Sequence, residues 1–94
     1  MEAQILNKFN NPTFQKLVVL IGDTSVLILE LIRLKDDPIN QDFVFIGFEK
    51  MRRVIDKLNK LIVYSDQISP VQTTVLLDFL YNIEHKLDFH TYNE

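Results

Sequence analysis

Three prolines divide the chain, and each one follows a residue that caps helices. The pairs are Asn11-Pro12, Asp37-Pro38 and Ser69-Pro70. At a helix start, Asn, Asp and Ser side chains accept a hydrogen bond from an unpaired backbone N–H, and proline suits the first helical position because it has no N–H to leave unpaired. A stretch with apolar residues at helical spacing and no further proline comes after each pair. The sequence therefore predicts three helix starts.

The predicted helices cover residues 12 to about 35, 38 or 40 to about 64, and 70 to about 88. In the second of them, apolar residues alternate by four and three positions, as in a coiled-coil seam: Val44, Phe48, Met51, Ile55, Leu58 and Ile62. The short connections between the helices favour antiparallel neighbours. We therefore expect an all-α fold, a small antiparallel three-helix bundle in one domain over residues 1–94, with an additional short N-terminal helix or arm over Glu2–Phe9.

Two local signals concern single residues. Ser69 is followed three residues later by Gln72, which is the spacing of a capping box, where the two side chains each bind the other residue's backbone N–H.

Gly22 is the one weak place in the first long helix. It could mark a kink or break where a ligand approaches, or it could be tolerated at a cost of about 1 kcal/mol relative to alanine. We expect one continuous helix, bent at most.

The first long helix is apolar around most of its circumference. Its polar residues Lys16, Asp23 and Glu30 recur every seven positions and form only a narrow stripe. A three-helix monomer would leave the outer side of such a helix in water, so we expect the chain to associate with itself as a homodimer and with another protein. The candidate partner-binding residues are Val19, Leu20, Val26, Leu27, Phe43 and Phe45.

A basic stretch gives a second candidate site, made of Lys50, Arg53, Lys57 and Lys60. Acidic and apolar residues interrupt it, no known nucleic-acid-binding motif surrounds it, and the formal net charge of the chain is −3. These features favour a solvated helix face over a phosphate-binding surface. Nucleic acid is therefore an unlikely partner, although a site there stays open as an alternative.

The residue types that carry catalysis or bind cofactors show no recognisable pattern. Two glycines are too few for a phosphate-binding loop, and the absence of cysteine excludes thiolate metal ligands. His85 and His90 are five residues apart, whereas ligands on one helix face are three or four apart. We expect a protein that is not an enzyme and holds no cofactor or metal.

The best candidate for a membrane span, residues 17–34, contains Asp23, Glu30 and Arg33. Each charge costs about 2.5–3.5 kcal/mol near the centre of a bilayer, so we expect no span. The first residues lack the basic and apolar regions of a secretory signal, which predicts a cytoplasmic location.

Together these features predict a non-enzymatic protein–protein interaction module, a small regulator, adaptor or inhibitor that acts through an apolar helical surface. Two alternatives remain open. One is a nucleic-acid-binding regulator that uses the basic face of residues 50–60, which strongly salt-dependent DNA binding would reveal. The other is a neutralising partner of a toxin or host protein, of the kind found among small phage and plasmid proteins, which copurification with a stoichiometric partner would reveal.

Overall fold

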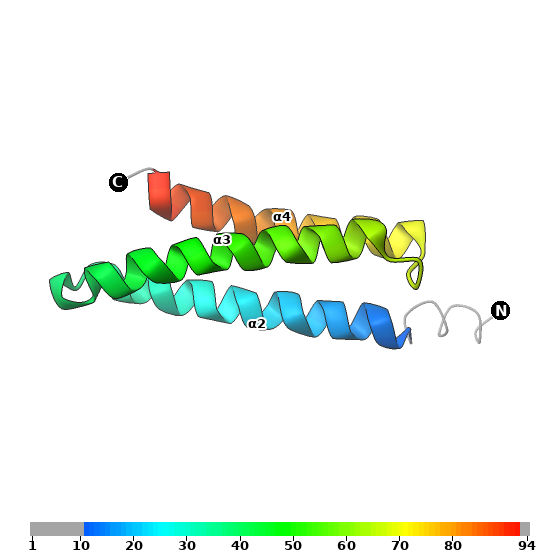
Figure 1. Ribbon diagram of the computed structural model, residues 1–94, viewed down its shortest axis with the longest axis horizontal. Helices are drawn as coiled ribbons and strands as arrows, with labels where there is room; N and C mark the ends of the chain where they lie inside the picture. Colours follow the sequence, from blue (N-terminus) through cyan, green and yellow to red (C-terminus); the bar gives the residue numbers. More distant parts are fainter. Residues whose placement is uncertain (1–10, 93–94) are drawn as a thin grey trace.

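Three long helices make up the computed structural model, which describes residues 11–92. They are α2 (Pro12–Leu34), α3 (Gln41–Tyr64) and α4 (Pro70–Tyr92), and a short 3-10 helix, η1 (Pro38–Asn40), precedes α3. The helices pack against one another, and residues 11–92 contain no strand (Figure 1). The all-α three-helix prediction is confirmed. The predicted N-terminal helix over Glu2–Phe9 lies outside the described residues.

All three Pro-containing pairs begin helical segments. The Asn11 side chain accepts hydrogen bonds from the N–H groups of Thr13 (2.9 Å) and Phe14 (3.3 Å). Asp37 accepts one from the Ile39 N–H (3.0 Å), but this cap begins η1, and α3 itself starts at Gln41 without a side-chain cap. The Asp37-Pro38 pair thus marks the start of a 3-10 turn that leads into α3.

The capping box at the start of α4 is present with both of its hydrogen bonds. The Ser69 N–H donates to Gln72 Oε1 at 2.9 Å, and the Gln72 N–H donates to Ser69 Oγ at 3.2 Å. Gln72 is buried, so its side chain is held in place by packing as well as by this bond. The box fixes the first turn of α4 after the loop of residues 65–69.

One apolar core runs along the bundle and takes a stripe from each helix. It consists of Phe14, Leu17, Ile21, Ile28 and Leu31 from α2, Val44, Phe48, Ile55, Leu58 and Ile62 from α3, and Leu76, Leu80, Ile83 and Leu87 from α4. The predicted seam of α3 is therefore the side that faces the core, with Met51 only partly buried. Ridges spaced by three and four residues suit the small crossing angles of helix bundles.

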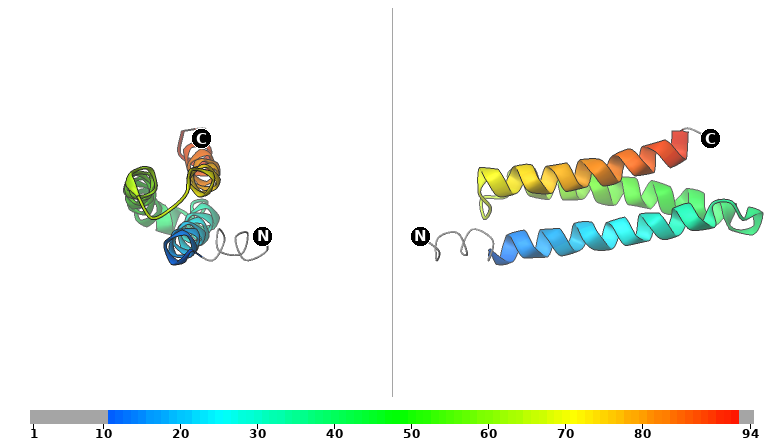
Figure 2. Two further views of the ribbon diagram at one scale, coloured as in Figure 1. Left: turned by 90° about the vertical axis from the view of Figure 1, so that its right-hand side faces the viewer. Right: turned by 180° about the vertical axis from the view of Figure 1, so that it is seen from behind.

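Two contacts set how α2 and α3 lie against each other. A Cβ atom placed on Gly47 would be 2.6 Å from Leu31 Cδ2, so the Leu31 side chain of α2 packs directly against the backbone of α3 at Gly47. At the other end, Asn11 Nδ2 donates to the Gln67 carbonyl oxygen. The chain direction reverses at each connection, so α2 and α4 are parallel to each other and antiparallel to α3 (Figure 2).

Helix α2 is continuous through Gly22, as predicted. Nothing lies within 4 Å of a Cβ placed on this glycine, which therefore sits on an open surface. Two residues later, Thr24 faces the core, and its hydroxyl donates to the Leu20 carbonyl oxygen at 2.7 Å. That bond satisfies the buried hydroxyl inside the helix, which is how α2 tolerates a polar residue at a core position.

Ser69→Ala is expected to lower the free energy of unfolding by about 1 kcal/mol, because Gln72 loses its N-cap acceptor. Ser65→Ala is the matched control, since the Ser65 hydroxyl accepts only an exposed turn hydrogen bond from the Gln67 N–H. Its effect should stay within about 0.5 kcal/mol. Chemical denaturation at one protein concentration measures both, and equal losses would contradict a special role for the capping box.

Alanine at the two glycines should have opposite effects on stability. Gly22→Ala is expected to stabilise the protein by up to about 1 kcal/mol, since the site is open and alanine favours helix. At Gly47 the added methyl group would meet both Leu31 methyl carbons, at 2.6 and 2.9 Å, so Gly47→Ala should destabilise. Overpacking costs about 1–3 kcal/mol, more than the gain in helix propensity. Thermal unfolding compares the two, and stabilisation by both would contradict the close approach of α2 and α3.

Candidate protein-interaction surface

The six candidate partner-binding residues are all exposed, but they do not form one patch. Leu20, Leu27 and Phe43 lie on the side of the bundle formed by α2 and α3. Val19 and Val26 lie on the outer side of α2, and Phe45 lies on the opposite flank of α3. The positions of these residues follow from their spacing relative to the contacts between the helices.

On α2, the reference point is Leu31, which meets α3 at Gly47. Leu27 precedes Leu31 by four residues and Leu34 follows it by three, so both lie on the flank of α2 next to α3. Leu20 is seven residues before Leu27 and shares that flank. Leu20 and Leu27 are 46% and 52% exposed, whereas Leu34 is partly buried against the core.

On α3, the reference point is Gly47. Phe43 precedes it by four residues, and Val54 and Leu61 follow it by seven and fourteen, so all three lie on the flank of α3 next to α2. Phe43 and Leu61 are 62% and 57% exposed, and Val54 is partly buried. We call the surface formed by the following residues the α2–α3 face: Leu20, Leu27, Leu34, Phe43, Val54 and Leu61.

Charged residues border the α2–α3 face with opposite signs on its two helices. Asp23 and Glu30 follow Leu20 and Leu27 by three residues and lie farther out on α2. On α3, Lys50 and Lys57 follow Gly47 and Val54 by three residues and also lie farther out. Lys16 precedes Asp23 by seven residues in the same stripe of α2. Beyond Lys16, the face therefore has two carboxylates along α2, which we call the acidic row, and two ammonium groups along α3, the basic row.

Most of these bordering charges are unpaired within the bundle. Glu30 binds Arg33, 2.8 Å away on the same helix, where both side chains are exposed. In the part of the chain that the structure describes, Asp23, Lys50 and Lys57 form no ion pair. An exposed ion pair such as Glu30–Arg33 contributes only about 0–1 kcal/mol to stability. Glu30 can therefore exchange Arg33 for another cation at little cost.

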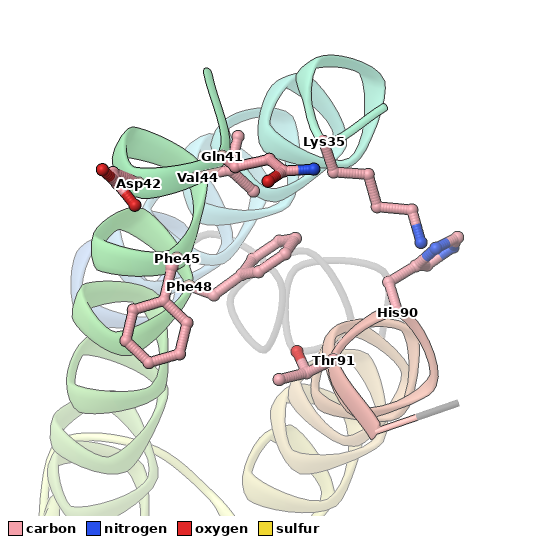
Figure 3. Close-up of a pocket in the computed structure, with 8 residues that line it drawn as sticks. All are labelled: Lys35, Gln41, Asp42, Val44, Phe45, Phe48, His90 and Thr91. Atoms are coloured by element: carbon pink, nitrogen blue, oxygen red, sulfur yellow. The ribbon is translucent and has the colours of Figure 1, made fainter. Parts of the chain in front are cut away.

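Phe45 belongs to a different region, at the end of the bundle where α3 begins and α4 ends. It lines a pocket of about 500 Å³ together with Phe48, Lys35 and His90 (Figure 3). Phe48 points from α3 into the bundle, while the Lys35 and His90 side chains point toward one another. Because Phe43 and Phe45 are two residues apart on a helix, they lie on nearly opposite flanks of α3.

The basic candidates Lys50, Arg53, Lys57 and Lys60 are all exposed on the solvent side of α3, so the fold brings them together. Acidic residues remain among them. Lys60 Nζ lies 3.2 Å from Asp56 Oδ2, and Glu49 is exposed one turn before Arg53. The stretch is a mixed-charge helix surface.

Two other classes of site are absent from the part of the chain that the structure describes. Residues 11–92 contain no cluster of three or more His, Cys, Asp or Glu side chains arranged to hold a metal ion. No helix in this part of the chain has the length and hydropathy needed to cross a membrane.

Several residues of the α2–α3 face were not identified from the sequence. The sequence alone does not assign Leu34, Val54 or Leu61 to a site, and it gives no indication of the contact between Leu31 and Gly47. The seven-residue spacing of Leu20, Leu27 and Leu34 was a usable signal, as was that of Gly47, Val54 and Leu61. Each series indicates a flank of its helix, although only the packing shows that the two flanks adjoin.

Comparisons with protein-family models, with curated proteins and with solved structures give no match to this chain. Its function has to be inferred from the surface that it presents.

Because carboxylates lie among the basic residues of α3, we expect no binding of duplex DNA at physiological salt. Phosphate contacts give affinities that depend steeply on salt, and the formal net charge of −3 opposes them. A gel-shift titration at physiological and low salt tests this. Submicromolar binding at physiological salt that is lost on changing Lys57 and Lys60 to Gln would contradict the expectation and favour the nucleic-acid alternative.

Proposed function

We propose that this chain is a non-enzymatic protein-interaction module that acts through the α2–α3 face, as a small regulator, adaptor or inhibitor. The observation that carries the proposal is the exposure of four large apolar side chains on adjoining flanks of two helices, namely Leu20, Leu27, Phe43 and Leu61. Contiguous apolar surface of this kind is characteristic of protein-binding sites.

The opposite surface of α3 supports this assignment by contrast. The side formed by α3 and α4 carries Glu49, Asp56, Glu84 and Asp88, and Arg52 binds Asp88 across the two helices. Exposed Phe45 and Tyr81 lie on this side as well, so it is a mixed surface of charged and apolar side chains. The α2–α3 face differs from it because its charged residues lie along its borders.

The shape of the α2–α3 face suits a helical partner. Leu27, Leu34 and Val54 lie where the flanks of the two antiparallel helices adjoin, between the more exposed apolar residues of the face. An amphipathic helix laid along this line would bury apolar residues spaced by three and four, the usual pattern of helical recognition. The module would therefore recognise helices.

Changing Leu20 and Leu27 together to Asn is expected to weaken binding to a protein partner, including a second copy of the chain, by at least about tenfold, because each buried leucine contributes about 1.5–3 kcal/mol. Affinity purification from the cells that encode the protein identifies stoichiometric partners, and light scattering measures self-association. Circular dichroism checks that the variant remains helical.

Val19→Asn with Val26→Asn is the matched control, since these residues are in the same helix at the same seven-residue spacing but lie on its outer side. Its effect on binding should be smaller. Loss of binding in the control and not in the leucine variant would move the site to the outer side of α2. A chain that neither self-associates nor retains any partner would contradict the proposed function itself.

A further inference from the structure

Resting on the proposed function, we propose that the partner of the α2–α3 face is a second copy of the chain, related by a two-fold axis that runs parallel to the helices. In this dimer, α2 of each copy packs against α3 of the other. The acidic row of each copy then meets the basic row of the other, and the apolar residues of both faces are buried between them.

The register of α2 and α3 places the charges at matching levels. Leu31 of α2 lies against Gly47 of α3, and at the other end Asn11 binds Gln67 in the loop that follows α3. Counting along the helices from the Leu31–Gly47 contact puts Asp23 opposite Ile55, two residues from Lys57, and Glu30 opposite Phe48, two residues from Lys50. At 1.5 Å per residue, each acid lies within about 3 Å of the level of a lysine along the bundle axis.

Rotation about a two-fold axis parallel to the helices keeps each residue at the same height along the bundle axis. It places α2 of one copy against α3 of the other. Asp23 of one copy therefore comes to the level of Lys57 of the second copy, and Glu30 comes to the level of Lys50. Each pair forms twice, because a two-fold interface is self-complementary. Asp23 and both lysines lack an ion-pair partner within the described residues, so they are available for these contacts.

The other simple way to place two such faces together is disfavoured by the same charges. A two-fold axis across the helices would lay α2 on α2 and α3 on α3. Lysines 50 and 57 would then face the lysines of the second copy, and Asp23 and Glu30 would face the second copy's carboxylates. Juxtaposed like charges cost several kcal/mol at an interface, so the charge rows select the parallel axis.

The size of the face is sufficient for a specific dimer. A helix of 23 residues, the length of α2, is about 35 Å long, and two helices side by side are about 20 Å wide. Covering such a face on both copies buries roughly 1,400 Å², within the range of standard protein interfaces. The apolar side chains at its centre and the charges along its edges match the usual anatomy of an interface.

Charge reversal tests this arrangement directly. One variant carries Asp23→Lys and Glu30→Lys, and the other carries Lys50→Glu and Lys57→Glu. We expect the unmodified chain to sediment at twice its 11.1 kDa mass at micromolar concentration. Each variant alone should have a dimer dissociation constant raised at least about tenfold by like-charge repulsion. Mixing the two variants in equal amounts should restore a dimer that contains one of each.

The matched control for the Asp23→Lys and Glu30→Lys variant is Asp78→Lys with Glu84→Lys, which makes the same change in net charge at exposed positions of α4 away from the face. It should leave the dimer unchanged. Restoration on mixing also shows that both variants fold. A dimer that ignores the charge reversals, or mixed variants that stay monomeric, would overturn the inference while leaving the proposed function standing. An unmodified chain that is monomeric at these concentrations would overturn it as well, and partner capture through Leu20 and Leu27 would then carry the proposed function alone.

Discussion

A helix in a three-helix bundle can bury only the side that faces the other two helices, and α2 has more apolar surface than that side can hold. Its core positions follow one stripe from Phe14 to Leu31. Leu20 and Leu27 lie beside this stripe, still largely in water. Because α3 adds Phe43 and Leu61 next to them, part of the exposed apolar surface is gathered on one face, while Val19 and Val26 remain exposed on the outer side of α2. The position of these residues is the reason why we propose the α2–α3 face as the binding side.

Much of the fold could be predicted because its signals are local. Asn11, Asp37 and Ser69 cap the segments that follow them, and the alternation by four and three in α3 indicates the side that becomes buried. Each of these signals lies within one or two helical turns of sequence. They fix where helices begin and which stripe is apolar, independently of how the helices later pack.

The candidate site could be predicted only in part, because it depends on which flanks adjoin. Phe43 and Phe45 are near neighbours in sequence, yet one borders α2 and the other lines the pocket near the end of α4. Conversely, Leu20 and Leu61 are far apart in sequence and share one face. The contact between Gly47 and Leu31 determines this geometry, and a lone glycine within a helical pattern gives no indication of the residue that it will meet.

The apolar residues and the charged residues of the α2–α3 face would have different effects on the proposed binding. Burial of leucine and phenylalanine side chains supplies affinity but is non-directional, so it would accept many partners and many orientations. The rows of Asp23 with Glu30 and of Lys50 with Lys57 add direction, because they are complementary in one arrangement and repulsive in another. A partner that binds only the folded chain also stabilises it by mass action. Helix α2 is incompletely covered by its own fold, so under the proposed function the stability and the association of the chain would be coupled.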